Sequence, residues 1–355
     1  MHNPYKFLTL ALLLQWASLI LIGCGYFLFS FRLFLIKRTR EQQQRELKKL
    51  LEIVLRKEAK FNLKQLPKKY IKVACLLPVM EELKKQQPGS YWPVIESILL
   101  DDFLLPQARM LTNKVKFTER LLAVRVFLLD TKPRDEAHIF RLLKDSIPLV
   151  RHEAILCAVR LGSKLLVNQL IDSMAGEARF AKYVYKDALR EASEGVFSNI
   201  KERLLTEKND KKRIVCMQLL AFKEDDAIVN YIGHDKYSPD MEVRIAVAKV
   251  LGFCSQPASV QMLTDLLKDK YWEVRAAAAK ALGQLKAEQA ILDLTQSLKD
   301  SRWWVRMHSA AALLNLGNEG LAVLKSQDPQ RDRFAYEMAQ YVIKHGEIKG
   351  VGVAS

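Results

Sequence analysis

The sequence predicts an all-α protein: an α-solenoid of about seven 31-residue helical hairpins, preceded by one transmembrane helix. Three observations predict this fold class. Glycine and proline are scarce, at 14 and 11 among 355 residues, which favours long helices over a turn-rich β fold. One short pattern returns every 31 residues through most of the chain. An uncharged apolar stretch lies close to the N-terminus.

The apolar stretch is the first element. After a short N-terminal segment (residues 1–6), the 25 residues from Phe7 to Phe31 carry no charge, and a further apolar patch extends to Ile36. About 20 apolar residues are enough to cross a bilayer as a helix, so residues 7–36 are expected to be a transmembrane helix. Six Lys and Arg follow between residues 37 and 49. The flank richer in these residues normally stays in the cytoplasm, which predicts a single-pass protein of the cytoplasmic (inner) membrane, with the N-terminus outside and the repeats in the cytoplasm.

Two other interpretations compete for this stretch. A cleaved signal peptide has a shorter apolar region, of about 7–15 residues, and is disfavoured. The run Leu21-Ile22-Gly23-Cys24 resembles the lipobox of bacterial lipoproteins, which would lipidate Cys24 and place the rest of the chain outside the cytoplasm. The residues after Cys24 are apolar, where a lipoprotein normally has a polar tether. The lipoprotein therefore stays the minor alternative.

A basic amphipathic helix is expected next, over residues 37–61. Five apolar residues recur on one helical face, while Lys, Arg and Glu occupy the others. This stripe has three interpretations: packing on the next domain, a short coiled-coil seam, or a basic helix lying on anionic lipid at residues 37–60. Ten of the sixteen net positive charges of the chain lie within residues 32–90. The excess of basic residues therefore indicates membrane topology and lipid binding more than nucleic-acid binding. The five apolar residues are Leu47, Leu50, Leu51, Val54 and Leu55.

Residues 62–113 are interpreted as a degenerate N-terminal helical cap. Their pattern is helical but falls outside the 31-residue register, and breaks are expected at Pro67, Pro88-Gly89 and Pro106.

The repeat itself occupies residues 114–327. The pattern Leu-Lys-Asp, followed by Val-Arg, recurs around Arg151, Arg275 and Arg306. Stepping by 31 residues from one of these arginines reaches another basic residue each time, without insertion or deletion. Three of the basic residues are preceded by an Asp six residues earlier. We call these basic residues and acids the ladder. The basic residues are Arg120, Arg151, Lys182, Arg213, Arg244, Arg275 and Arg306, and the acids are Asp145, Asp269 and Asp300.

Each basic residue begins the register of a first helix. The residues three, six and seven positions later are small or apolar in every unit and lie on one helical face. Gly252 and Gly283, eight positions later, favour close helix packing or a loosened helix end. A second helix fills the rest of each unit, as in 257–267 and 288–298, and such short helices bury their apolar faces only by stacking.

These motifs resemble the HEAT-repeat family, and specifically the short repeats of the phycobilisome-lyase type, in a membrane-anchored bacterial HEAT-repeat protein. The match is clearest at Asp269–Gly283. The resemblance implies a right-handed solenoid in which the ladder Asp and Arg bridge adjacent units and cap helix ends. The units of Lys182 and Arg213 depart from it, because Gly176 and Glu207 stand where the Asp is expected. Residues 328–345 are expected to be the closing helix, and residues 346–355 a flexible tail.

The residues that carry chemistry point away from an enzyme. Cys157, Cys216 and Cys254 fall on apolar helix positions and are expected in the core, and the odd, unpaired set of five cysteines favours a reducing compartment. The dyad His152-Glu153 is similar to the iron-binding pairs of deoxyhypusine hydroxylase, a HEAT-like-repeat enzyme, but one dyad cannot hold two irons. That activity and bilin lyase activity are disfavoured, and we expect no cofactor, no metal and no catalytic residues. Trp272 and Trp303 share one turn position and are expected to pack in the turn.

The function that follows is a non-enzymatic scaffold for protein–protein interaction. Solenoids present an extended concave face, usually lined by the second helices, so we expect a protein partner, itself membrane-associated, to contact solvent-facing residues there. Binding of nucleic acid or another anionic ligand is the alternative, weakened by a net charge of only +5 over residues 91–355. The oligomeric state stays open. The expected contact residues are Asn168, Gln169, Gln261, Asp265, Asp293 and Gln296.

Overall fold

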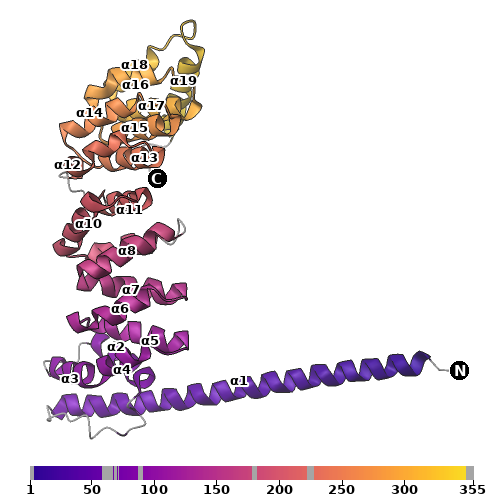
Figure 1. Ribbon diagram of the computed structural model, residues 1–355. Coiled ribbons are helices and arrows are strands. Elements are labelled where there is room, and N and C mark those ends of the chain that lie inside the picture. Colours follow the sequence, from indigo (N-terminus) through magenta and orange to yellow (C-terminus); the bar gives the residue numbers. More distant parts are fainter. Residues whose placement is uncertain are drawn as a thin grey trace. The chain divides into compact units, whose positions relative to one another are not determined.

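The structure, a computed structural model, describes residues 4–57, 67, 70, 72–86, 91–177, 182–221 and 228–348, without the side chains of 4–18, 20, 56, 57, 347 and 348. Every regular element in these ranges is helical (Figure 1), which confirms the predicted all-α class. The chain divides into two compact units, residues 1–130 and 131–355.

The first unit begins with one long helix, α1 (Pro4–Lys57), drawn in indigo and purple in Figure 1. Its 54 residues correspond to a length of about 80 Å. Between residues 19 and 36 the described apolar side chains are exposed on all sides of the helix, for example Leu21 at 72% and Phe29 at 60%.

The predicted transmembrane helix 7–36 is not supported by the structure. Part of this span, residues 7–18 and 20, lies outside the described side chains. Among the residues that are described, no helix combines the length and the apolar character needed to cross a membrane.

The second half of α1 packs on the next helix, α2 (Val73–Lys85). Leu47 and Leu51 of the apolar stripe are fully buried, and Lys48 Nζ donates to Glu82 Oε1 at 2.7 Å. Of the three interpretations of this stripe, packing on the following domain is therefore confirmed.

The rest of the first unit is a small helical cluster. It comprises α3 (Trp92–Leu99), the π-helical turn η2 (Leu100–Leu104), α4 (Leu105–Leu111) and α5 (Phe117–Leu129). The predicted break at Pro106 is wrong, because the chain runs from α3 through η2 into α4 without leaving the helical region. Proline lacks a backbone N–H and clashes with the carbonyl one turn earlier, and the wider π turn before it relieves both problems. The predicted break at Pro88-Gly89 lies outside the described residues.

The 31-residue register of the repeats is confirmed by where the first helices begin. Helices α5, α7, α11, α13, α15 and α17 each start three residues before their ladder residue, while α9 is described from Lys182 itself. Figure 1 shows the helices of the second unit in chain order along that unit. Its first helices are α7 (Pro148–Leu161), α9 (Lys182–Ala188), α11 (Asp210–Ala221), α13 (Met241–Leu251), α15 (Trp272–Gln284) and α17 (Trp303–Asn315).

Second helices alternate with them, and three of these second helices are flanked by a 3₁₀ turn. Pro257 stands in the first turn of α14, as predicted, where its missing N–H costs nothing. The second helices are α6 (Glu136–Leu143), α8 (Lys164–Gly176), α10 (Glu194–Thr206), α12 (Ile228–Ile232), α14 (Pro257–Leu266), α16 (Ile291–Ser297) and α18 (Asn318–Lys325). The 3₁₀ turns are η3 (Pro133–Asp135), η4 (Leu189–Glu191), η5 (Gly233–Tyr237) and η6 (Glu288–Ala290).

The predicted inner face of the first helices is the core. All residues at positions three, six and seven of the register are buried. Successive first helices α11, α13, α15 and α17 pack on one another in order, so small side chains at position three set how closely they approach. The residues at position three are Ala123, Ala154, Tyr185, Cys216, Val247, Ala278 and Ser309, and all except Tyr185 are small or medium-sized.

The end of the chain is closed by α19 (Arg333–Ile348), which packs on α17 and α18. This confirms a helix near the predicted closing position, although it extends to residue 348, beyond the predicted start of the tail. Residues 349–355 of the tail lie outside the described part of the chain.

Four of the five cysteines are buried, including the three predicted core residues Cys157, Cys216 and Cys254, and burial raises the pKa of the Cys157 and Cys216 thiols to about 12. Thiolate is the reactive form. In a Cys24→Ser variant, we therefore expect dithionitrobenzoate to label no thiol rapidly at pH 8, with rates at least about 100-fold below that of free cysteine. Adding denaturant should expose all four. A rapidly labelled thiol in the folded variant would contradict the described packing.

Candidate functional site

The ladder arginines anchor the turn that precedes their own helix. Arg244 donates from Nη1 to the carbonyl oxygens of Ser238 and Pro239 at 2.6 and 3.2 Å. Arg275 and Arg306 make the same pair of contacts to the residues six and five positions earlier. Each guanidinium therefore satisfies carbonyls that the turn leaves without a helical partner.

Two of these arginines also reach forward into the next hairpin. Arg244 donates from Nε and Nη2 to the two carboxylate oxygens of Asp269 at 2.7 and 3.0 Å. Arg275 binds Asp300 in the same way, at 2.6 and 3.0 Å. These are bidentate, charge-assisted pairs, which are stronger and more directional than a single hydrogen bond. The bridging role that the resemblance implied is observed for these two pairs. We call each such pair of a ladder arginine and an acid of the next hairpin a rung.

The ladder acids have a second task. One oxygen of Asp269 accepts from the N–H of Tyr271, and one of Asp300 from the N–H of Arg302, each at 2.8 Å. Asp145 does the same for Ile147 at 2.9 Å. Asp269 and Asp300 thus fix their own turns while they hold the arginines of the preceding hairpins.

The pKa values of Asp269 and Asp300 reflect this pairing. Burial alone would raise the pKa of each carboxyl, but the arginine hydrogen bonds, the turn N–H and the guanidinium charge outweigh it, and both pKa values lie below the ordinary value. A carboxyl with a lowered folded-state pKa contributes stability that is present above its unfolded pKa and is lost as the pH falls through the folded value.

We therefore expect the melting temperature to be nearly constant from pH 7 to about pH 5 and to fall between about pH 4 and pH 2. Circular dichroism at 222 nm as a function of temperature measures this. An Asp269→Asn, Asp300→Asn double variant should start from a lower melting temperature and lose less of it on acidification. An equal loss in both proteins would contradict a stabilising role of these two carboxylates.

Arg151 and Arg213 pair with acids that lie outside the register. Arg151 donates from Nη2 to Glu177, one residue after the predicted gap at Gly176, at 3.0 Å. Arg213 donates from Nη2 to both oxygens of Asp235 at 2.8 and 2.7 Å. Sequence reasoning missed both acids, since neither stands at the register position. The one available signal was an acidic residue next to Gly176.

Glu207 shows how the irregular turn is held. It accepts from the N–H groups of Lys208 and Asn209 and from Arg203 within its own hairpin. Burial would raise its pKa, but these hydrogen bonds lower it overall. Arg120, the first ladder residue, binds the carbonyls of Lys114 and Val115.

The predicted partner surface divides into three places. Asn168 and Gln169 are half-buried on α8, where Gln169 donates to Ser173. Gln261 and Asp265 lie one turn apart on α14 and bond to each other at 3.3 Å. The hydrogen bond from Lys236 lowers the pKa of Asp265 against the raising effect of burial.

Asp293 and Gln296 line an open groove. It runs beside the C-terminal ends of α14 and α16, and its accessible volume is about 240 Å³. Lys268 approaches Asp293 across it, with Nζ 3.6 Å from Oδ1. The other lining residues are Leu267, Ser297, Lys299 and the ladder acid Asp300, so the groove is polar, charged and directly attached to a rung of the ladder.

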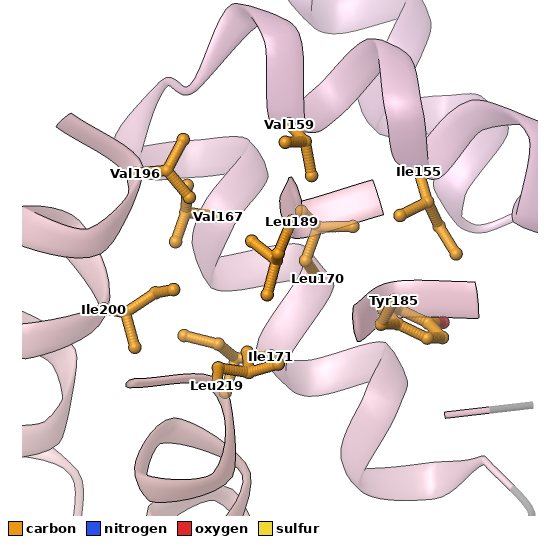
Figure 2. Close-up of a pocket in the computed structure, with 10 residues that line it drawn as sticks. All are labelled: Ile155, Val159, Val167, Leu170, Ile171, Tyr185, Leu189, Val196, Ile200 and Leu219. Carbon is orange, nitrogen blue, oxygen red and sulfur yellow. The ribbon is translucent and has the colours of Figure 1, made fainter. Parts of the chain in front are cut away.

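A second cavity is lined by apolar side chains. It lies among α7, α8, α9, η4, α10 and α11, where Figure 2 shows aliphatic side chains and the Tyr185 ring pointing toward one another. Its accessible volume is about 10 Å³, roughly the space one water molecule needs. This cavity is a packing gap beside the irregular Lys182 unit, too small for an organic ligand.

The dyad His152-Glu153 is not part of a metal centre in the part of the chain that the structure describes. No group of three or more His, Cys, Asp or Glu side chains is placed there so as to hold a metal ion. His152 Nε2 lies 3.9 Å from the carboxylate of Glu177, which is already held by Arg151.

Aromatic side chains at the turns give a mixed outcome. Trp272 is half-buried, as expected of a turn-packing residue. Trp303 and its neighbour Trp304 are 44% and 52% exposed, so the prediction is wrong for Trp303. Both stand in the first turn of α17, ahead of Val305, the first buried residue of that helix.

Comparison with protein families supports the repeat assignment at the C-terminal end. Residues 234–315 and 263–340 each match the family described as HEAT repeats. No curated protein matches the chain.

Several solved structures match the chain at low similarity. YibA of Escherichia coli is 20% identical, with 53% of this chain and 74% of that chain covered and a TM-score of 0.38. Human deoxyhypusine hydroxylase is 17% identical, with 72% and 99% covered and a TM-score of 0.29. An engineered protein is 17% identical, with 86% and 95% covered and a TM-score of 0.35. At these values none of the three says anything about function.

Proposed function

We propose that the protein is a non-enzymatic scaffold whose HEAT-repeat solenoid binds a protein partner. The observation that carries the proposal is the groove at α14 and α16. It is open and polar, and it contains two of the six residues that the sequence nominates for partner contact, Asp293 and Gln296. One lining residue, Asp300, is held by Arg275, so this part of the surface is preformed, and a preformed surface loses less conformational entropy on binding.

The second-helix surface beside this groove has the composition of a contact site. Leu292, next to Asp293 in the chain, is 81% exposed, and Lys268, Gln296 and Lys299 of the groove lining are exposed as well. Modest protein interfaces usually combine exposed aliphatic side chains with polar and charged groups in this way.

Site-specific crosslinking tests this surface. A photoreactive phenylalanine placed at Gln296 of the full-length protein should crosslink to one partner in cells. The matched control is Lys249, which is exposed on the first helix α13. Partner crosslinks of equal yield from Lys249 and Gln296, or none from Gln296, would contradict the assigned face.

We further propose that the N-terminal segment attaches the scaffold to the cytoplasmic membrane. The support is the sequence of residues 7–36 and its basic flank, together with the exposed apolar side chains between residues 19 and 36. Exposed apolar surface of this extent on a helix is unfavourable in water, and lipid would cover it. A single pass with the repeats in the cytoplasm follows from the charge distribution, and the partner is then membrane-associated.

Extraction at alkaline pH tests the attachment. The full-length protein should stay with the membrane in carbonate, whereas a Phe27→Asp, Leu28→Asp variant should be released. Arg38→Ala, in the basic flank, is the control and should be retained. Release of the unchanged protein would contradict the attachment, and labelling of a cysteine introduced at Ser355 from outside intact cells would favour the lipoprotein.

A further inference from the structure

Arg306, the last ladder arginine, makes only one of the two sets of contacts that Arg244 and Arg275 make. Arg306 donates from Nη1 to the carbonyls of Asp300 and Ser301 at 2.8 and 3.2 Å. These are the contacts that orient Arg244 and Arg275. The guanidinium of Arg306 is therefore held in the same orientation relative to its own turn.

The other edge of the Arg306 guanidinium, formed by Nε and Nη2, lacks the carboxylate that the internal rungs have in the part of the chain that the structure describes. Arg244 and Arg275 use Nε and Nη2 to bind the acid 25 residues later, but the residue 25 positions after Arg306 is Arg331. Arg306 is only 9% exposed, and among the described residues its Nε has no hydrogen-bond partner. A buried donor without a partner is costly, so this edge is a preformed fork that lacks its acceptor.

The side chains around this fork are aromatic and basic. The ring of Phe334 lies 5.1 Å from the guanidinium and is itself 63% exposed. Trp303 and Trp304 lie on the same helix with their rings edge to face, 4.7 Å apart. Arg302 is exposed beside them, and its backbone N–H, not its guanidinium, donates to Asp300. Tryptophan and arginine are the residues that dominate protein interfaces.

The charge of this patch selects among ligands. Two tryptophan rings at right angles could accept a quaternary ammonium, but Arg302 and Arg306 oppose any cation. A nucleic-acid strand needs several cations to neutralise successive phosphates, and the patch offers two. A single carboxylate beside an apolar side chain satisfies both the fork and the rings.

We propose that Arg306 binds a carboxylate of the partner protein, carried by an acidic segment whose neighbouring apolar side chain packs on Trp303 and Trp304. The internal rungs define the geometry: both carboxylate oxygens face the Nε and Nη2 edge, at distances near 2.6–3.0 Å. Phe334, which covers the guanidinium, moves aside or packs on the incoming segment. This inference rests on the proposed partner binding but uses the turn edge of the last hairpins, a different surface from the α14–α16 groove.

The chain itself supplies a suitable probe. A fluorescein-labelled peptide with the sequence of residues 266–272 carries one acid, Asp269, in the context that fills the Arg244 rung. Fluorescence polarisation with the full-length protein should show saturable binding. Replacing the peptide's Asp by Asn should weaken it at least about tenfold, because the bidentate pair is lost. Arg306→Lys, which keeps the charge but removes the fork, should weaken it equally.

The matched control is Arg275→Lys, the same change at a rung that is already occupied; it should lower the melting temperature and leave peptide binding unchanged. Trp303→Ala is a second variant in case Arg306→Lys does not fold, and it should also weaken binding. Equal binding of the Asp and Asn peptides, or no binding, overturns the proposal. Arg306-dependent binding of an oligothymidylate or of phosphatidylglycerol vesicles without peptide binding overturns it in favour of phosphate. If only this inference fails, crosslinking from Gln296 persists; if the scaffold function fails, that crosslink is absent as well.

Discussion

Replacing Asp269 by alanine is expected to lower the free energy of unfolding by about 3 kcal/mol. The change removes the acceptor for two hydrogen bonds from Arg244 and for the N–H of Tyr271. The side chain of Arg244 is only 6% exposed, so it is left as a buried charge without its partner, and that unpaired charge is the main cost. Urea denaturation followed by circular dichroism measures the change.

The control for Asp269→Ala is Asp293→Ala, which removes an acid from a more exposed and longer pair with Lys268. Surface pairs of this kind contribute between about 0 and 1 kcal/mol, so the control should remain near the wild type. A second change, Arg244→Met in the Asp269→Ala background, should recover part of the loss by removing the unpaired charge. If Asp269→Ala changed stability no more than Asp293→Ala, the ladder would not be a source of stability.

Replacing Gly283 by alanine is expected to destabilise the protein by about 2 kcal/mol. A Cβ atom at Gly283 would lie 2.7 Å from the Cα atom of Ala312 on the neighbouring first helix. Backbone cannot rotate away as a flexible side chain can, so α15 and α17 would have to separate. These two helices form the most extensive packing in the second unit, which makes the separation costly.

The same substitution at Gly176 should have the opposite sign. Gly176 ends α8, and no atom of the residues that the structure describes lies within 4 Å of a Cβ placed there. Alanine is the better helix former by up to about 1 kcal/mol, so Gly176→Ala should stabilise slightly or be neutral. Thermal melts of the two variants check both predictions, and a Gly283→Ala protein as stable as Gly176→Ala would show that α15 and α17 are not so closely packed.

The helices of the repeats could be predicted from the sequence because their register depends only on the spacing of residues along the chain. Seven basic residues at intervals of 31 located the start of each first helix, and period-3.6 patterning identified the buried positions. The same logic anticipated close packing at Gly252, where a Cβ would meet Ala281 at 3.0 Å. Such features follow from spacing alone.

Features that depend on side-chain reach could not be predicted in this way. Glu177 and Asp235 replace the expected ladder acids from positions one residue and several residues out of register, since a long side chain or a shifted turn can bring a carboxylate to the same guanidinium. The π turn before Pro106 is a backbone adjustment with no sequence signal of its own. The sequence nominated Asp293 and Gln296 as exposed residues but did not predict the groove that they line. The shape of this groove depends on how α14 and α16 end.

The continuity of α1 has a geometric consequence for the first unit. Ile36, the last exposed residue of its apolar half, and Leu47, the first fully buried one, are eleven residues apart on one unbroken helix. They are therefore separated by about 16 Å along the axis and by a fixed rotation of about 100° per residue. The continuous helix therefore fixes both the distance and the angle between its exposed apolar half and its packed half. Inserting a single residue between Ile36 and Leu47 would increase that distance and rotate the packed face of α1 relative to its apolar half.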